Sequence, residues 1–441
     1  MSTIVALSTP VGRGAISVVR LSGDKSLVIA RLLAPQLDNV KARYATLAQL
    51  RYPETGEVLD EVVITYFQGP HSVTGEDVVE ISCHGSPAIV RQILDQTINL
   101  GARLADPGEF SLRALRNGKI DLAQAEAIRD LIAAETEAAV KQASRQVGGE
   151  LAHTLSLFES DLTKVMVLLE SALEFVEDDL PPNQVESVVQ LLTSTVTGVE
   201  KLANSYSAGR LLQHGVNVAI VGSPNVGKSS LFNRLVEQDR AIVTHIPGTT
   251  RDTLSHAIDI GGIPVVLVDT AGMRETDDTV ESIGIERTRR AMTDADLVLQ
   301  VVDGSEPDAA FLDEISTASI LVLNKSDLGP SVVSIKDARS VRVSALTGEG
   351  LDELRAAILA SLNRGDSSYE GLLITNARQF DLLSLASMAI REALGLLGDR
   401  ASEELVLVPL HNALRYLGQI TGETTSEEIL GQIFATFCIG K

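Results

Sequence analysis

The sequence predicts a multidomain protein in which an α/β P-loop domain is inserted into a helical domain that follows an α+β domain. A chain of 441 residues is long enough for about three domains. Short strand-like runs fill its first part, and a segment of alternating strands and helices stands between two helical regions. We therefore expect an α+β domain at 1–117, two halves of a helical domain at 118–214 and 363–441, and a doubly wound, mostly parallel α/β domain at 215–362.

The amino-acid composition restricts the cellular location and the binding partners that can be expected for the protein. Hydrophobic residues make up 44% of the chain and aromatic residues only 3%, so the cores must be aliphatic. The two cysteines, Cys83 and Cys438, give no metal-ligand spacing and no disulfide framework. No secretory leader and no apolar run of about 18 residues is seen, so we expect a cytoplasmic protein without a membrane segment. A net charge of −22 requires any RNA partner to be held by local basic patches or by a second protein.

The first 117 residues alternate strand-like runs with turns. Strands are predicted at 3–7, 15–21, 61–67 and 77–82. A helix is predicted from Ile89 to Leu100, because the helical period ends there and Gly101 follows. These patterns indicate an α+β domain, and they contain no pairing of a nucleophile with a base.

Long helices are predicted from about 119 to 210. The first stretch runs to Phe175 with a break near Gly148–Gly149, and Pro181–Pro182 separates it from a helix at about 184–207. Between Lys119 and Arg210 there are 15 Asp or Glu against 7 Lys or Arg. A solvated outer surface explains this acidity more simply than a protein-contact face, and RNA binding here is not expected. After a polar linker, helical periodicity resumes at about Asn376.

The segment Gly222–Ser229 fits the pattern G-x-x-x-x-G-K-[ST] in the context that this pattern requires. A buried strand is predicted at Val216–Val221 before it, and an amphipathic helix opens after it. The glycines let backbone N–H groups turn towards an anion at the helix N-terminus. Lys228 can reach the β- and γ-phosphates, and the hydroxyl of Ser229 can bind Mg²⁺. The segment predicts a nucleoside triphosphate site.

Three further motifs in strand context specify GTP. Asp269–Gly272 follows a predicted strand, and its carboxylate can reach the Mg²⁺ shell. In Asn324–Asp327 the last carboxylate can accept from the N1–H and 2-amine of guanine, a donor pair that adenine lacks. Ser344–Leu346 can add a backbone contact to the guanine carbonyl. Thr250, in the segment Gly248–Asp252, is the natural second hydroxyl ligand of Mg²⁺ on a switch loop.

The residues after Gly272 raise a question about hydrolysis. Met273 stands where Ras-like enzymes have a Gln that orients water, and a thioether cannot take that role. Four acidic residues follow closely: Glu275, Asp277, Asp278 and Glu281. From the sequence alone each is more simply a solvated acid than a catalyst.

With these residues in hand, the chain resembles the MnmE (TrmE) family of tRNA-modification GTPases over nearly its full length. The nucleotide motifs alone would fit several GTPase families. The more specific matches lie outside them, at Thr74–Asp77, Pro107–Phe110, Lys119–Ala127 and the terminal Phe437–Lys441.

The resemblance implies a homodimer that works with a partner flavoprotein, an FAD-containing MnmG-type protein, in a heterotetramer. Together they would install an aminomethyl-type or carboxymethylaminomethyl group on C5 of the wobble uridine, position 34, of certain tRNAs. A tetrahydrofolate, as the 5,10-methylene or 5-formyl form, would donate one carbon. Folate contacts fall by motif match on Arg20, Glu80, Lys119 and Lys441. Cations suit the glutamate carboxylates of folate, and a Glu suits the donor edge of its pterin.

The resemblance also implies a hydrolysis mechanism that depends on K⁺ and on dimerisation of the G domains. Asn225 and a loop containing Thr244, Ile246 and Thr249 would bind K⁺ where an arginine finger would otherwise stand. Glu281 matches the water-positioning glutamate of the family. His245 stands where an acid is common, with little effect expected because the loop binds through carbonyls. The nucleotide and ion contacts then expected are Asn225, Val226, Gly227, Lys228, Ser229, Ser230, Thr244, His245, Ile246, Pro247, Gly248, Thr249, Thr250, Asp269, Thr270, Ala271, Gly272, Asn324, Lys325, Asp327, Ser344 and Ala345.

Two questions stay open on the sequence. Cys438 is either a small buried hydrophobe near the terminus or a group close to the modification chemistry. The protein itself is either the tRNA-modifying enzyme or a ribosome-assembly GTPase that acts as a switch. The second class typically carries a KH fold or a second G domain, and the sequence shows no repeated P-loop.

Overall fold

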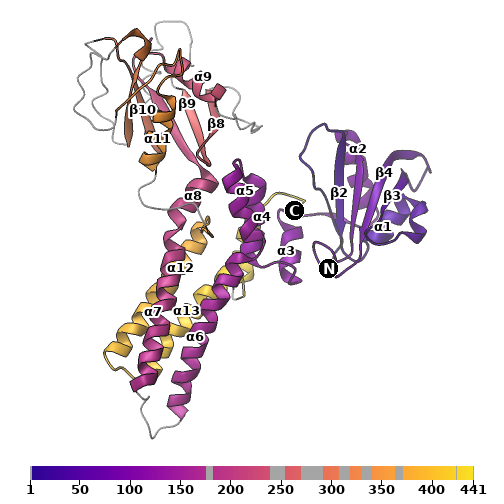
Figure 1. Ribbon diagram of the computed structural model, residues 1–441. Helices are drawn as coiled ribbons and strands as arrows, with labels where there is room; N and C mark the ends of the chain where they lie inside the picture. The colour runs from indigo at the N-terminus through magenta and orange to yellow at the C-terminus, as the bar shows by residue number, and fades with distance from the viewer. Residues whose placement is uncertain are drawn as a thin grey trace. The chain divides into compact units, whose positions relative to one another are not determined.

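The computed structural model describes residues 2–174, 182–238, 254–269, 292–306, 318–329, 340–362, 371–423 and 425–440. The chain divides into two compact units (Figure 1). The first comprises Met1–Arg129, Val147–Ser156 and Leu414–Lys441, and the second comprises Asp130–Gln146 and Leu157–Ala413. The described helices and sheets confirm the predicted multidomain fold class, and no helix within the described ranges is both long and apolar enough to cross a membrane.

The first unit is organised around a six-stranded sheet of order β3-β4-β5-β2-β1-β6. Its strands are β1 (Ile4–Leu7), β2 (Ile16–Ser22), β3 (Ala45–Arg51), β4 (Val58–Phe67), β5 (Val78–His84) and β6 (Arg103–Leu104). Only β1 and β6 pair in parallel. Helices α1 (Ser26–Leu33) and α2 (Pro87–Asn99) share one apolar core with the sheet, in which Ile29, Ile64 and Ile93 are buried. Alternate residues such as Val63 face away from it.

A smaller apolar cluster holds the C-terminal segment in the same unit. It is formed by α3 (Glu109–Arg116), α4 (Leu122–Ala133) and α14 (Glu427–Phe434), with Leu122, Phe434 and Phe437 buried. Gly108 begins α3 in the left-handed conformation, with φ at 66°. A Cβ at this position would lie 2.6 Å from the Phe434 carbonyl oxygen, so the close approach of α14 requires glycine here.

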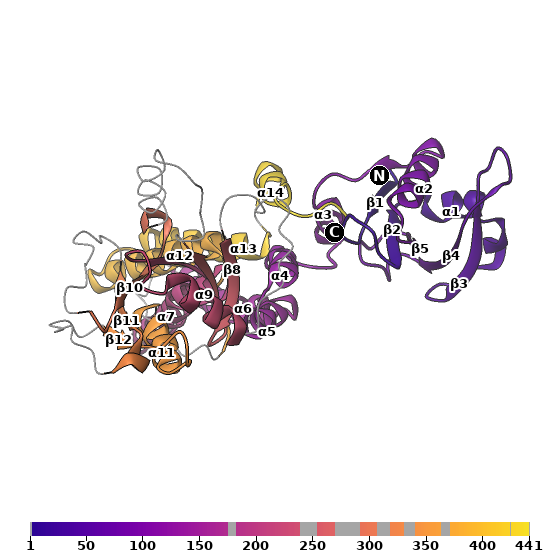
Figure 2. The same ribbon diagram turned by 90° about the horizontal axis from the view of Figure 1, so that it is seen from above.

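The long helices α6 (Glu150–Glu174), α7 (Pro182–Asn204), α12 (Ala377–Gly398) and α13 (Glu403–Thr421) lie side by side in both views (Figures 1 and 2). Residues 157–174 of α6 and 403–413 of α13 belong to the second unit, together with α7, α12 and the shorter helices α5 (Glu137–Val147, up to Gln146) and α8 (Tyr206–His214). Glu200 pairs with Arg391 at 2.5 Å and so joins α7 to α12. The predicted break at Gly148–Gly149 is confirmed. The predicted helix at 184–207 is instead two helices that meet at Ser205, whose hydroxyl accepts from the Ile374 N–H at 3.0 Å.

The α/β part of the second unit contains a sheet of order β12-β11-β10-β7-β9-β8. Its strands are β7 (Val216–Val221), β8 (Leu254–Ile260), β9 (Ile263–Asp269), β10 (Leu297–Asp303), β11 (Ser319–Asn324) and β12 (Ser340–Arg342). All pairs are parallel except β8 with β9. Helices α9 (Lys228–Gln238) and α11 (Leu351–Leu362) share a core with it that includes Leu231 and Leu354. The carboxyl ends of the parallel strands therefore place their motifs along one edge of the sheet.

Candidate functional site

The loop between β7 and α9 has the backbone of a phosphate cradle. Gly222 and Gly227 have φ of 151° and 96°. A Cβ at Gly222 would lie 2.1 Å from the Val301 carbonyl oxygen, and one at Gly227 would lie 2.2 Å from the Asn324 side-chain nitrogen. Both positions therefore require glycine. Asn225 between them is left-handed, with φ at 64°, a conformation that asparagine tolerates better than most residues.

Helix α9 begins at the residues that were predicted to bind phosphate and Mg²⁺. Lys228 is its first residue, and its buried ammonium donates to the Ser223 carbonyl oxygen at 2.8 Å. Ser229 and Ser230 follow in the first turn and are exposed. The N–H groups of a first helical turn lack partners within the helix, so this end of α9 can receive an anion.

The two predicted guanine motifs are joined to each other and to the phosphate loop by one side chain. Asn324 is buried, and its amide donates to the Val226 carbonyl oxygen at 2.8 Å. Its carbonyl oxygen accepts from the Ala345 N–H at 3.0 Å. Ser344 donates its hydroxyl to Asp327 at 2.5 Å. The structure therefore brings together Asn324, Asp327, Ser344 and Ala345, four of the residues for which guanine contacts are predicted.

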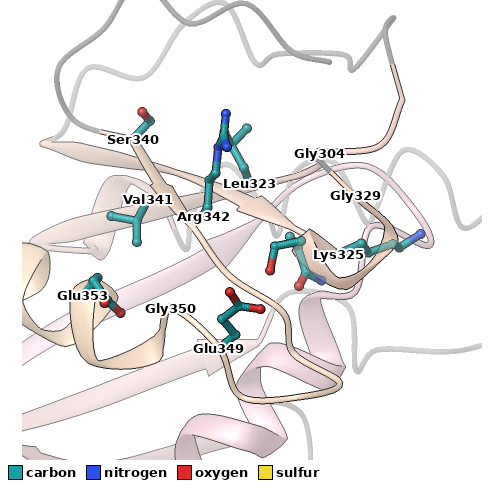
Figure 3. A pocket seen from close by; sticks show the side chains of 12 residues that line it. Gly304, Leu323, Lys325, Gly329, Ser340, Val341, Arg342, Glu349, Gly350 and Glu353 are labelled. Atoms are coloured by element: carbon teal, nitrogen blue, oxygen red, sulfur yellow. The ribbon is translucent and has the colours of Figure 1, made fainter. Parts of the chain in front are cut away.

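Two cavities flank Asn324 and Lys325. One, of about 430 Å³, is lined by Gly227, Ser230, Asn233, Arg234, Glu237, Asn324, Lys325, Asp327, Ala345 and Leu346. This cavity carries the residues predicted to read guanine. The other, of about 540 Å³, is bordered by charged side chains that include Arg342, Glu349 and Glu353 (Figure 3).

Lys325 is held beside these cavities by an ion pair that the sequence did not predict. Its backbone is left-handed, with φ at 66°, and its ammonium lies 2.5 Å from the carboxylate of Asp303 at the end of β10. Burial by itself raises the pKa of the Asp303 carboxyl. Hydrogen bonds from Lys325 and from the hydroxyl and N–H of Ser305 outweigh burial, so this pKa is lowered. Asp303 therefore stays ionised and holds the side chain of Lys325 in place.

Many of the predicted contacts lie outside the described residues. Asp269 ends β9 beside Ile220 of β7, which is the placement expected for a residue near the phosphate loop, and only its backbone is described. The predicted residues outside the described ranges are Thr244, His245, Ile246, Pro247, Gly248, Thr249, Thr250, Thr270, Ala271, Gly272, Glu281 and Lys441.

In the first unit the structure joins Arg20 to Glu80. The two residues are opposite each other on β2 and β5, and the guanidinium lies 2.8 Å from the carboxylate. Arg20 also donates to the Gly440 carbonyl oxygen at 3.4 Å and lies 5.8 Å from the centre of the Phe110 ring. The residue before Lys441 therefore reaches the predicted folate contacts.

Lys119 lies at a different loop of the same unit. A Cβ at Gly75 would lie 3.4 Å from its side chain. The Arg20–Glu80 pair places a hydrogen-bond donor and an acceptor side by side, whereas the sequence prediction assigned the two residues to different parts of a folate.

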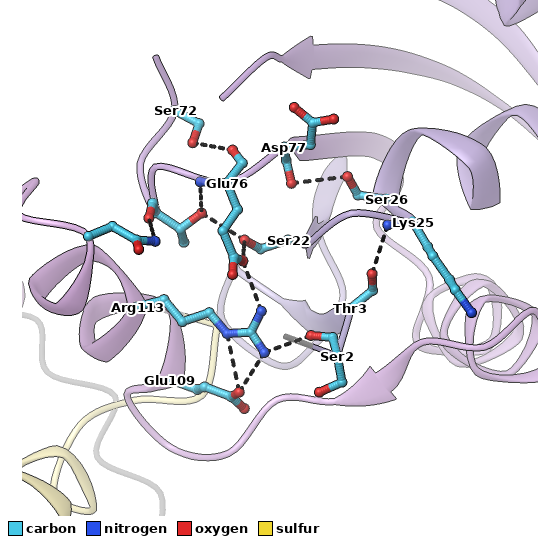
Figure 4. Close-up of polar contacts among 12 residues, drawn as sticks. Ser2, Thr3, Ser22, Lys25, Ser26, Ser72, Glu76, Asp77, Glu109 and Arg113 are labelled. Carbon is cyan, nitrogen blue, oxygen red and sulfur yellow. Dashed lines mark hydrogen bonds and ion pairs between the residues drawn. The ribbon is translucent and has the colours of Figure 1, made fainter. Parts of the chain in front are cut away.

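The motifs Thr74–Asp77 and Pro107–Phe110 meet in a buried ion network (Figure 4). The side chain of Arg113 is 3% exposed and donates to Glu76 and Glu109, both at 2.8 Å. Burial alone raises the pKa of the Glu109 carboxyl, but hydrogen bonds from Arg103, the Asp106 N–H and Arg113 outweigh it, so this pKa is lowered. The network fixes the loop before α3.

Cys438 is exposed, so the interpretation of this residue as a small buried hydrophobe is wrong. Its carbonyl oxygen accepts from the Gly108 N–H at 3.4 Å, which holds the backbone while the thiol faces solvent. The sequence could not distinguish the two interpretations, because exposure depends on how the tail packs against α3. Cys83 is the buried cysteine, and burial raises the pKa of its thiol to about 11.

Comparison with known proteins identifies the family. A model described as the GTP-binding protein TrmE N-terminus matches residues 3–119, and a model described as the MnmE helical domain matches residues 122–438. The tRNA modification GTPase MnmE of Koribacter versatilis is 47% identical over 100% of this chain and 99% of its own length. The chain belongs to the MnmE family. The corresponding protein of Aquifex aeolicus is 43% identical over 99% of both chains.

Membership of the MnmE family makes the chain a GTP hydrolase. It also favours tRNA modification over ribosome assembly. A solved G domain of the iron transporter FeoB from T. maritima is 28% identical over 34% of this chain and 99% of that chain, with a TM-score of 0.27, and adds nothing to the assignment.

Two residues of the MnmE-type G domain were missed by the sequence analysis. Asp303 holds Lys325, and Arg234 of α9 donates to backbone oxygens of the 344–346 loop. An acid at the end of β10 was visible as a strand-end carboxylate beside the phosphate motifs. Nothing in the spacing indicates Arg234, since it acts on carbonyl groups about 110 residues away in the chain.

Proposed function

We propose that this chain hydrolyses GTP to GDP in order to drive modification of C5 of the wobble uridine, position 34, of certain tRNAs. It would act as a homodimer together with an MnmG-type FAD flavoprotein, in a heterotetramer in the cytoplasm. The observation that carries the proposal is the joining of three motifs by Asn324, which ties the guanine loops to the phosphate loop. Full-length similarity to tRNA modification GTPases supports the tRNA substrate.

Two metal ions would assist hydrolysis. The hydroxyls of Ser229 and Thr250 would hold Mg²⁺ near Asp269. Asn225, Thr244, Ile246 and Thr249 would hold K⁺. Each ion supplies positive charge where negative charge develops on the phosphates. The left-handed Asn225 and the exposed Ser229 at the start of α9 fit these roles. Glu281 would orient the attacking water.

A tetrahydrofolate, as the 5,10-methylene or 5-formyl form, would bind to the first unit and supply the carbon. Arg20, Glu80, Lys119 and Lys441 would contact it, and the exposed Cys438 would stand close to the same place. The Arg20–Glu80 pair and its bond to Gly440 support this site, because they gather ionic groups from two strands and the tail. A carboxylate next to a guanidinium suits a flat ligand edge that has both donors and acceptors.

The acidic surface limits how tRNA is held. With a net charge of −22, most of the phosphate contacts would be made by the flavoprotein or by basic residues gathered in the assembly.

Nucleoside analysis of tRNA tests the proposed function. Cells that lack the protein should contain wobble uridine without the C5 group, and the wild-type gene should restore it. The Lys228→Ala variant should fail to restore it, because Lys228 belongs to the phosphate loop. Normal modification in the deletion strain would refute the proposal.

A further inference from the structure

Arg234 links the phosphate-loop helix to the loop that follows β12. It lies on α9, six residues after Lys228. Its Nε donates to the Ala345 carbonyl oxygen at 3.2 Å, and its Nη2 donates to the carbonyl oxygen of Leu346. The rigid fork of a guanidinium suits two successive carbonyl groups, because its N–H groups point along fixed directions.

The loop that Arg234 holds lies on the surface. Leu346 is 74% exposed, so packing of its side chain contributes little to the loop conformation. The other ties to the loop are polar: the Ala345 N–H donates to Asn324, and the Ser344 hydroxyl donates to Asp327 and accepts from the Thr347 N–H at 3.1 Å. Arg234 is the tie that comes from α9.

Arg234 and the loop line the same cavity of about 430 Å³ as Asp327. The cavity is lined by groups that would contact different atoms of the base. Asp327 would accept from N1–H and the 2-amine. The Ser344 N–H donates to the Glu349 carbonyl oxygen at 2.9 Å and the Ala345 N–H donates to Asn324, so the Leu346 N–H is the group of the 344–346 loop that would donate to the 6-oxygen. A peptide N–H forms a strong hydrogen bond to a ligand oxygen only if the peptide group is ordered before the ligand binds. If the peptide group becomes ordered on binding, the loss of conformational entropy lowers the affinity.

We propose that Arg234 is a positioning residue that sets the selectivity of the site for the 6-oxygen of guanine. It acts by holding the carbonyl groups of Ala345 and Leu346, so that the Leu346 N–H, which belongs to the same peptide group as the Ala345 carbonyl, faces the base. This inference rests on the proposed guanine contacts of the 344–346 loop and Asp327. It goes beyond them by assigning the order of this loop to a side chain of α9.

Binding of three nucleotides tests the proposal: GDP, the GDP analogue with sulfur in place of the 6-oxygen, and inosine diphosphate, which lacks the 2-amine. Sulfur accepts a hydrogen bond weakly. In Arg234→Ala the affinity for GDP should fall about three- to tenfold, the scale of one hydrogen bond, while affinity for the sulfur analogue falls less. The preference for GDP over the sulfur analogue should therefore shrink, and the preference for GDP over inosine diphosphate should not change.

The Arg234→Lys variant is the matched control, since it keeps the positive charge and one nitrogen that can donate hydrogen bonds. It should recover part of the lost preference. An equal loss for GDP and the sulfur analogue, or no loss at all, in both variants would overturn the proposal. The proposal would also be overturned if, in Arg234→Ala, the preference for GDP over inosine diphosphate fell as much as the preference for GDP over the sulfur analogue. Such a result would mean that the whole cavity is altered. Any general unfolding would affect all three nucleotides equally.

The Asp327→Ala variant separates this inference from the function on which it rests. It should reduce the preference for GDP over inosine diphosphate. If that preference is unchanged, the assignment of the guanine site itself fails. If it shrinks while Arg234→Ala leaves the sulfur preference unchanged, only the role of Arg234 is refuted.

Discussion

Asn324 is the residue on which the geometry of the nucleotide site depends most. It is buried and joins the carbonyl oxygen of Val226 to the N–H of Ala345. Truncation would leave both backbone groups without this partner, at a cost of about 1–3 kcal/mol each. We expect Asn324→Ala to weaken GDP binding at least about tenfold, as measured by calorimetric titration.

A second asparagine provides the control for that variant. Asn376 caps α12 by accepting from the Arg378 N–H at 2.9 Å. The Asn376→Ala variant should lose about 1 kcal/mol of stability and keep the affinity for GDP. Equal loss of affinity in the two variants would contradict a specific role for Asn324.

Glu109 makes the stability of the first unit depend on pH. Its pKa in the folded state lies below the ordinary value of a glutamate, because hydrogen bonds from Arg103, the Asp106 N–H and Arg113 outweigh the effect of burial. The stabilisation is therefore complete above the unfolded pKa and is lost as pH falls through the folded pKa. We expect Glu109→Gln to lower stability by about 2 kcal/mol at neutral pH, a difference that shrinks in acid.

Thermal unfolding of the wild type and variant from about pH 7 to about pH 3 measures this difference. The control is Glu200→Gln, which breaks the more exposed pair with Arg391. That variant should change stability by less than about 1 kcal/mol. A difference between wild type and Glu109→Gln that is the same at all pH values would refute the assigned ionisation.

At the level of single residues, the sequence predicts contacts that depend on fixed spacing along the chain. Asn324 and Asp327 lie where their motif requires, because both follow the end of one strand. The pairing of Arg20 with Glu80 depends on the register of two strands 60 residues apart. The hydrogen bonds of Arg234 depend on how α9 packs beside the loop after β12. The spacing of residues along the chain therefore predicts neither the Arg20–Glu80 pair nor the contacts of Arg234.

At the level of elements, the sequence predicts those with strong periodicity. The strand Val216–Val221 was predicted with its observed ends, because it is largely apolar and is buried at all but one position. Two edge strands were missed. The residues of β3 form no continuous apolar run, and β8 contains the polar residues Ser255, His256 and Asp259. Edge strands need less apolar surface, so their pattern is weak.

The C-terminal tail is an element whose place is fixed by Gly440. Its φ is 96°, and a Cβ there would lie 2.2 Å from the carbonyl oxygen of Leu7. The Gly440 carbonyl oxygen accepts from Ser8 and Arg20. We expect Gly440→Ala to displace the tail, to lower stability by about 1–2 kcal/mol, and to weaken binding of 5-formyl-tetrahydrofolate in titration.

The matched control is Gly431→Ala in α14. A Cβ at Gly431 meets no atom within 4 Å, so alanine should keep or raise helix stability by up to about 1 kcal/mol. Folate affinity should stay as in the wild type. If Gly440→Ala binds folate as tightly as Gly431→Ala does, the tail is not part of the folate site.

At the level of the whole molecule, the sequence predicted that an α/β segment interrupts a helical domain. The matched helical-domain model spans 122–438, on both sides of β7–β12. This organisation follows from a change of hydrophobic period from helix to strand and back, which is a local signal. The division into two compact units could not be predicted from such local signals, because the first unit combines the start of the chain with a short part of α6 and the C-terminus.

Dependence of GTP turnover on K⁺ and on a second subunit is the prediction that concerns the assembled protein. Turnover should be about a hundredfold faster in KCl than in NaCl, because under the proposal K⁺ would supply the positive charge that phosphoryl transfer requires. The rate per molecule should rise with protein concentration in KCl only. Phosphate release, followed over a range of protein concentrations in each salt, measures both effects.

The Asn225→Gly variant tests the ion site, since glycine tolerates the left-handed φ of 64° and removes only the amide ligand. It should bind GDP like the wild type and lose the stimulation by K⁺. Equal turnover of the wild type in the two salts, or a stimulated Asn225→Gly variant, would exclude this mechanism.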